Sequence, residues 1–221
     1  MGYVVFHMEK ARGSDSAMTA HIERTSHPKN ADESRTHLNR TLIEYPEGVK
    51  DRTAVIQHRL EHAGLKRKIG SNQVRAIRIN LSGSPEDIAR IEAAGQLDAW
   101  CTDSLQYLFD TFGRENIISA HLHMDEKTPH IHATLVPIVQ AARTRRKKED
   151  QVKRHYRKKS ADIPRLCADD IMTRGRLKSY QDGYAKAMSH HGLQRGIDGS
   201  EARHISTQQY YRDLKKQSHE L

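Results

Sequence analysis

The chain has 221 residues, of which 36% are hydrophobic and 29% charged, and this is enough for one sizeable core but hardly for two domains. Its 37 Lys and Arg residues outnumber 28 Asp and Glu residues, and the net charge of +9 favours an anionic partner, either nucleic acid or an acidic membrane face. The absence of an apolar run of about 18 residues and of a secretory signal argues against a membrane protein, and the two distant cysteines argue against a disulfide framework.

The first third of the chain is predicted to contain two strands and a short helix. Residues 3–8 (YVVFHM) are β-branched and aromatic enough for a strand, and 73–83 form an approximate second strand. A short helix is expected within 50–63. The polar stretch 9–39 is expected to be mostly loop, and a loop of this length in a compact domain usually binds or catalyses.

The clearest predicted helix follows, over residues 85–112. Ser84 is a suitable N-cap residue and Pro85 occupies the first helical position. Apolar residues recur at helical spacing, with an interruption or kink at Gly95, and Gly113 ends the pattern.

The second half of the chain is predicted to contain a hairpin, a basic segment and a helix. Residues 116–123 and 130–139 are expected to form antiparallel strands joined by a connection of six residues. The run 143–159 has ten Lys or Arg in seventeen residues and cannot build a packed core. A final helix is expected over about 169–191.

The hairpin carries the most informative motif, HMDEKTPHIH at residues 123–132. Side chains alternate between the two faces of a strand, so His130 and His132 lie on one face. On the partner strand, His121 and His123 are likewise two residues apart and share a face. Three imidazoles can converge there, and a divalent cation is the usual reason to gather them. Three protein ligands leave open positions, as in a catalytic site.

Two acidic residues lie on the turn of this hairpin. Asp125 and Glu126 can supply a ligand, a hydrogen-bonding partner or a proton acceptor. The competing interpretation is that a chain with fifteen histidines exposes a few of them on a hairpin. His121 lies one step further from the turn, so we expect it to be a supporting or surface residue rather than a ligand.

The motif resembles the HxDExxPHxH signature of the MOBV class of relaxases, the Mob/Pre plasmid mobilisation and recombination proteins of the HUH endonuclease superfamily. HIER at 21–24 is similar to the HxxR first motif of that family, and SRTHLN at 34–39 to the segment after it. YQDGYAKAM, GLQRG and SEARH are similar to the region beyond the metal motif. The resemblance covers nearly the whole chain in the same order.

The resemblance implies an α+β fold in which a central antiparallel sheet is flanked by helices. It also implies an enzyme that nicks one strand of plasmid DNA at an origin of transfer, remains bound to the 5′ phosphate and later rejoins the ends. The implied cofactor is Mn²⁺ or Mg²⁺, held by His123, His130 and His132. Such a cation neutralises the charge that grows on the scissile phosphate.

The resemblance also implies catalytic residues. Most HUH enzymes attack with tyrosine, but the first motif has none, and His21 is the candidate nucleophile because a neutral imidazole needs no strong base. Glu126 is expected to orient His21 or accept its second proton, and Arg24 to hold a phosphate through its planar fork. Tyr45, on the same segment, is the rival nucleophile.

A further set of residues is expected to contact DNA. The basic run supports this independently of any family, since each paired Lys or Arg releases counterions from the phosphate backbone. Arg35 and Asn39 are expected to touch DNA or to support the first motif, and His37 to do likewise or merely to pack. His204 is expected either to contact DNA or to be a surface residue. The remaining expected contacts are Arg145, Arg146, Lys147, Lys148, Lys153 and Arg154, with Tyr156 as a stacking residue.

We therefore expect a single relaxase domain over 1–221, with a basic loop at about 141–162 and a helical C-terminal part at about 165–221. The expected partner is single-stranded or hairpin DNA, together with other conjugation proteins, in the bacterial cytoplasm. Relatives usually continue into a longer C-terminal region, so the chain is either a piece of such a protein or a compact member. Two alternatives stay open: a non-catalytic DNA-binding module with a structural metal, and a hydrolase of small phosphoesters.

Overall fold

The structure is a computed structural model that describes residues 2–140 and 163–196. Six strands form one sheet in the order β2-β4-β5-β3-β1-β8, and each pairing is antiparallel except the parallel pairing of β1 with β8. Its strands are β1 (Gly2–Lys10), β2 (Arg40–Thr41), β3 (Ile77–Gly83), β4 (Ile117–His123), β5 (His130–Leu135) and β8 (Leu193–Gln194). A separate ladder pairs β6 (Ile138–Val139) with β7 (Arg165–Leu166).

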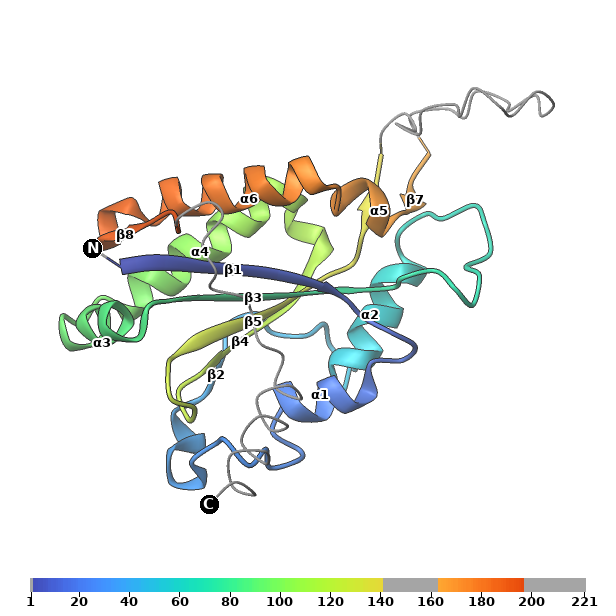
Figure 1. Cartoon of the computed structure of the whole chain (residues 1–221). Coiled ribbons are helices and arrows are strands. Elements are labelled where there is room, and N and C mark those ends of the chain that lie inside the picture. Colours follow the sequence, from blue (N-terminus) through green and yellow to red (C-terminus); the bar gives the residue numbers. More distant parts are fainter. Residues whose placement is uncertain (1, 141–162, 197–221) are drawn as a thin grey trace, which may run out of the picture.

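Helices cover both faces of the sheet (Figure 1). One side carries α4 and α6, while α1 and α2 lie on the other side. The α-helices are α1 (Ser16–Ile22), α2 (Arg52–Glu61), α3 (Pro85–Ala93), α4 (Leu97–Phe112), α5 (Ala168–Ile171) and α6 (Arg174–Ala187). Short 3-10 turns are η1 (Glu33–Leu38), η2 (Arg114–Asn116) and η3 (Ser189–His191). Among the described residues no helix is both long and apolar enough to span a bilayer.

The apolar face of the sheet packs against α3, α4 and α6 to form the main core. Alternation along β3 and β5 turns Ile79, Leu81 and Ile131 toward this side, where each is at most 1% exposed. Trp100 of α4 and Tyr184 of α6 are fully buried in the same cluster. Burying side chains of this size contributes roughly 1.5–3 kcal/mol each, so this layer fixes the sheet.

The opposite face of the sheet is polar at its centre, and this is where the histidines lie. His132 on β5 is the direct cross-strand partner of His121 on β4 and of Asn80 on β3. His130 pairs with His123 at the turn end of the same ladder. The four histidines therefore lie on one face of the sheet, as expected from the sequence. Helix α1 lies against this face.

Most predicted elements are confirmed, including the helix break. Gly95 and Gly113 take positive φ angles of 68° and 87°, which favour glycine, and they separate α3 from α4 and end α4. Ser84 precedes α3 as expected, although its hydroxyl bonds Asp87 and the backbone N–H of Tyr3 rather than capping the helix backbone.

The expectation that 9–39 is mostly loop is wrong in part, because the stretch contains α1 and η1. Seven residues are too few for α1 to show helical periodicity in the sequence, and its N-cap residue Asp15 bonds Arg52 instead of capping the helix. Tertiary contacts stabilise α1, since Thr19 bonds Thr53 and Arg52 of α2, and Ile22 is 3% exposed.

Two predicted boundaries are also corrected. The strand expected over 130–139 ends at Leu135, because Pro137 has no N–H to donate to the ladder. The helix expected over about 169–191 is interrupted between α5 and α6, where the Thr173 side chain accepts a hydrogen bond from the backbone N–H of Arg176. The basic loop at 141–162 and the C-terminal part beyond 196 lie outside the described residues.

Candidate active site

Three imidazole rings meet at the turn end of the β4–β5 hairpin. His123 is the last residue of β4, His130 the first of β5, and His132 lies two residues further. The ring centroids are 5.2 Å apart for His123 and His130, 4.8 Å for His123 and His132, and 4.7 Å for His130 and His132. The rings converge, as the strand alternation predicts.

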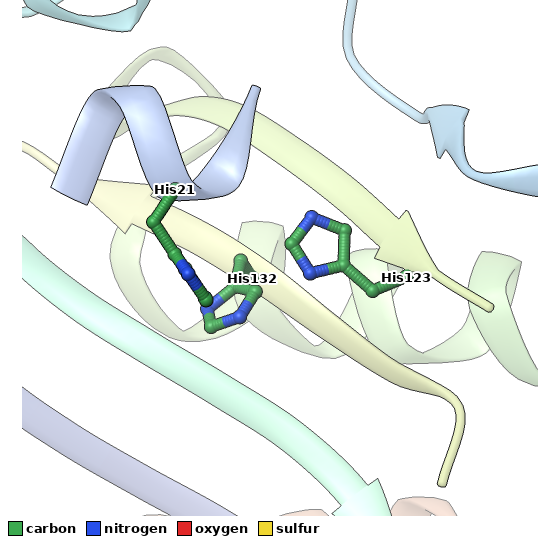
Figure 2. A group of neighbouring side chains, drawn as sticks. All are labelled: His21, His123 and His132. Carbon is green, nitrogen blue, oxygen red and sulfur yellow. The ribbon is translucent and has the colours of Figure 1, made fainter. Parts of the chain in front are cut away.

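Helix α1 brings a fourth imidazole to the group (Figure 2). The His21 ring centroid lies 5.6 Å from that of His132 and 6.0 Å from that of His123. Single ring nitrogens of His21, His123 and His132 lie within 4.8 Å of one another. The first motif and the hairpin, about 100 residues apart in sequence, therefore form one site.

Backbone carbonyls determine which nitrogen carries the proton on two of these rings. His123 Nε2 lies 2.9 Å from the carbonyl oxygen of Ile22, and His130 Nδ1 lies 2.9 Å from that of Thr128. A carbonyl oxygen only accepts, so both nitrogens must donate. The lone pairs are therefore on Nδ1 of His123 and Nε2 of His130, and the latter lies 3.0 Å from His132 Nε2.

Burial keeps the His123 and His132 rings neutral. It lowers the pKa of His123 to about 3, with help from the neighbouring His130 and Arg24, and it lowers the pKa of His132 well below the ordinary value. A metal ion binds the neutral form of an imidazole, and a hydrogen bond from the other ring nitrogen to a carbonyl oxygen fixes the orientation of such a ligand. The chemistry of the donor set therefore fits a divalent cation.

Glu126 lies at the centre of this group. One of its carboxylate oxygens, Oε1, is 3.8 Å from His123 Nδ1, 3.9 Å from His130 Nε2 and 3.9 Å from His21 Nε2. Its other oxygen accepts a hydrogen bond of 2.7 Å from Asn30. Single ligand atoms of His123, Glu126 and His130 also lie within 4.8 Å of one another. Glu126 is thus within reach of both the candidate ligands and the candidate nucleophile.

Arg24 links the first motif to the acids of the hairpin. Its Nε and Nη2 donate to the two oxygens of Asp125 at 2.9 and 2.8 Å, and Nη2 also donates to Glu126 at 2.7 Å. Its Nη1 donates to the carbonyl oxygen of His21. The side chain is only 6% exposed, and the residue has a left-handed φ of 56°. The fork that was expected to hold a phosphate is occupied by Asp125 in this structure.

Asp125 is the buried anchor of the turn, and sequence reasoning gave it too little weight. Thr36 and Asn39 donate to its carboxylate at 3.1 and 2.7 Å, in addition to Arg24. Burial alone would raise the pKa of Asp125, but these hydrogen bonds hold it well below its usual range. Asp125 is therefore ionised and joins the 21–39 segment to the hairpin.

Asn39 occupies a supporting position. Its amide donates to Asp125, while its Oδ1 accepts a hydrogen bond of 2.7 Å from the backbone N–H of Met124. Asn39 was expected to touch DNA or to support the first motif, and these two hydrogen bonds favour the supporting role. Arg35 is half-buried in η1 and His37 is exposed.

The rival nucleophile Tyr45 lies in a separate network. Its hydroxyl donates to Glu23 at 2.7 Å and lies 3.0 Å from Nε2 of His121. Burial raises the pKa of Tyr45, and the hydrogen bond to Glu23 raises it further. The phenol is therefore held protonated, which makes it a poor nucleophile. His121 is 8% exposed, so it supports this network and is not a surface residue.

The other expected DNA contacts fall on residues that the structure does not describe. They are Arg145, Arg146, Lys147, Lys148, Lys153, Arg154 and His204, together with Tyr156.

Comparison with known proteins identifies the family. The family model described as plasmid recombination enzyme, Mob_Pre, matches residues 1–212. The chain therefore belongs to the Mob/Pre family of plasmid recombination enzymes, which confirms the resemblance.

Relatives agree with this assignment. A 65 kDa protein of Zymomonas mobilis is 30% identical, and the match covers 97% of this chain and 33% of that protein. A plasmid recombination enzyme of Bacillus thuringiensis is 27% identical, and the match covers 94% of this chain and 42% of that enzyme. The chain thus spans about a third to two fifths of the length of these relatives. The Mn-bound MobM relaxase domain (MOBV; Mob_Pre) on pMV158 oriT DNA matches with a TM-score of 0.74 and 24% identity, covering 96% of this chain and 99% of the other. This match confirms the expected fold.

Proposed function

We propose that the chain is a metal-dependent DNA relaxase that nicks and rejoins one strand at the origin of transfer of a plasmid or mobile element, and so initiates mobilisation. One observation carries the proposal. A neutral, partly exposed histidine on α1 lies beside a converging histidine group, with Nε2 of His21 3.9 Å from Glu126. A nucleophile next to a candidate metal site is the arrangement that phosphoryl transfer needs.

His123, His130 and His132 would hold the divalent ion, with Glu126 close enough to take part. When bound, such an ion neutralises charge on the phosphate in the transition state. The MobM relaxase domain is described as Mn-bound, which favours Mn²⁺ over Mg²⁺ for this chain.

His21 would be the nucleophile. Its pKa is lowered, first by burial and then by Arg24, so the ring is neutral at pH 7. An unprotonated ring nitrogen attacks the phosphorus, the bond to the 3′ oxygen breaks, and that oxygen leaves as a hydroxyl after taking up a proton. The product is a phosphoramidate on the 5′ phosphate, and the reverse attack by the 3′ hydroxyl rejoins the strand.

Glu126 and Arg24 would serve this step in different ways. Glu126 orients His21 or accepts its second proton, since its Oε1 lies 3.9 Å from Nε2 of His21. Arg24 acts as a positioning residue, because it holds Asp125, Glu126 and the carbonyl of His21 at once. This role replaces the direct phosphate contact expected from the motif.

The partner would be single-stranded or hairpin DNA. The net charge of +9 and the basic run within 141–162 support it, as does the oriT DNA bound by the MobM domain. We place the protein in the bacterial cytoplasm, where plasmid DNA is processed, in contact with other conjugation proteins.

A nicking assay tests the proposal. Supercoiled plasmid carrying the origin of the protein's own element is incubated with Mn²⁺ and then treated with detergent and protease. We expect open circles with a blocked 5′ end. A free 5′ phosphate would instead indicate simple hydrolysis, and bound but intact plasmid would indicate the non-catalytic binding module.

A further inference from the structure

A second group of possible metal ligands lies on the other side of the sheet. Asp103 is on α4, and His190 and His191 are consecutive residues of η3, just after α6. The Nε2 atoms of both histidines lie 2.8 Å from the same oxygen, Oδ2 of Asp103. The three ligand atoms all lie within 4.8 Å of one another. Because both histidines already point at one carboxylate oxygen, the three side chains need only small movements to bind a cation.

The backbone on both sides of this group is fixed by packing. Next to Asp103, Ser104 bonds the Tyr184 hydroxyl at 2.9 Å, and both residues are fully buried between α4 and α6. The carbonyl of His191 accepts a hydrogen bond of 2.7 Å from Arg90. Gly192, at φ 78°, leaves room for this contact, because a Cβ there would lie 2.7 Å from Arg90 Nη2. The ligand positions are therefore held from both elements.

The group is accessible from one side. The His191 side chain is 3% exposed, whereas Asp103 and His190 are 38% and 60% exposed. A cation can therefore reach Oδ2 from solvent and keep water ligands. Two imidazoles and one carboxylate with open positions suit Zn²⁺ or a neighbouring first-row ion better than Mg²⁺ or Ca²⁺.

We propose that Asp103, His190 and His191 bind one divalent transition-metal ion of the zinc type, distinct from the candidate active site. On binding, each histidine presents an Nε2 lone pair and carries its remaining proton on Nδ1, so the ion replaces the two N–H···O hydrogen bonds. The ion would tie α4 to the turn that precedes β8. Since β8 pairs with Gly2 and Tyr3 of β1, it would secure that edge of the sheet.

Zinc stoichiometry tests the proposal without an activity measurement. The full chain is equilibrated with Zn²⁺, freed of excess metal and analysed by native mass spectrometry. In a variant that lacks the candidate active site, H123A/H130A/H132A, we expect one retained Zn²⁺ per chain and a higher Tm than in the metal-free protein. Adding Asp103→Asn should abolish both effects.

A second comparison keeps the test valid if the triple variant does not fold. In the otherwise unchanged chain, Asp103→Asn and His190→Ala should each lower the number of retained ions by one. His58→Ala is the matched control, because half-buried His58 and exposed His62 stack with ring centroids 4.2 Å apart and form another histidine pair. Equal zinc content in the wild type and the Asp103→Asn variant would mean that the group is a hydrogen-bonded cluster only, and would overturn the proposal.

Discussion

The carbonyl oxygen of Ile22 accepts a hydrogen bond of 2.9 Å from Nε2 of His123. This contact joins the last residue of α1 to the last residue of β4, and it leaves the lone pair of His123 on Nδ1. One bond thus fixes the orientation of a candidate metal ligand and places the candidate nucleophile, the residue before Ile22, beside it.

The nucleophile can be identified by comparing two variants. His21→Ala should abolish the covalent adduct between the protein and the 5′ end of nicked DNA. Tyr45→Phe should retain the adduct, because it removes only a partly buried hydroxyl whose hydrogen bonds are worth about 1 kcal/mol of stability each. Denaturing gel electrophoresis of end-labelled oligonucleotides measures both. An adduct formed by His21→Ala would refute the assignment.

Metal removal should separate cleavage from DNA binding. We expect EDTA to lower nicking by at least about 100-fold, since the charge on the transition state is then uncompensated, and added Mn²⁺ to restore it. His130→Ala should lower nicking similarly without rescue by moderate Mn²⁺. Fluorescence anisotropy with labelled origin DNA should show little change in affinity in either case. Equal nicking with and without EDTA would remove the metal from the mechanism.

Asp125→Asn should destabilise the protein. Its carboxylate is paired with Arg24, and breaking a buried pair by removing one charge costs about 3 kcal/mol. Because the folded-state pKa of Asp125 lies below its unfolded value of about 3.9, this stability is complete above that value and is lost as the pH falls toward the folded pKa. Urea unfolding should therefore show a difference from wild type that is constant near pH 7 and shrinks below about pH 4. A constant difference down to pH 2 would contradict the assignment.

The Asn39→Ala variant distinguishes a structural role of Asn39 from a direct contact with DNA. Loss of its bonds to Asp125 and to Met124 N–H should lower the free energy of unfolding by about 2 kcal/mol and should lower nicking. His37→Ala, at an exposed position of the same segment, is the control and should leave stability unchanged. Weaker DNA binding by Asn39→Ala with normal stability would instead support direct contact.

The basic run should determine the salt dependence of DNA binding. Replacing Arg145, Arg146, Lys147 and Lys148 with glutamine removes four phosphate-binding charges. The slope of log K against log salt concentration should become shallower by up to about 3, since each contact to single-stranded DNA contributes roughly 0.7. Unchanged slopes in anisotropy titrations would exclude this segment from the DNA interface.

The sequence alone determined the features that depend on local periodicity. Strand alternation placed His123, His130 and His132 on one face, because side chains two residues apart always share a face of a strand. The breaks at Gly95 and Gly113 were equally predictable, since their positive φ angles are a local preference of glycine.

Only the tertiary structure decided which distant groups meet. Arg24 carries a fork that suits a phosphate or a carboxylate equally well, and it contacts Asp125 because packing of α1 brings the two together across 101 positions. Asp103 likewise meets His190 and His191 only because α4 packs against α6. Residue type and spacing limit what a side chain can bind, but long-range packing of the backbone selects the partner.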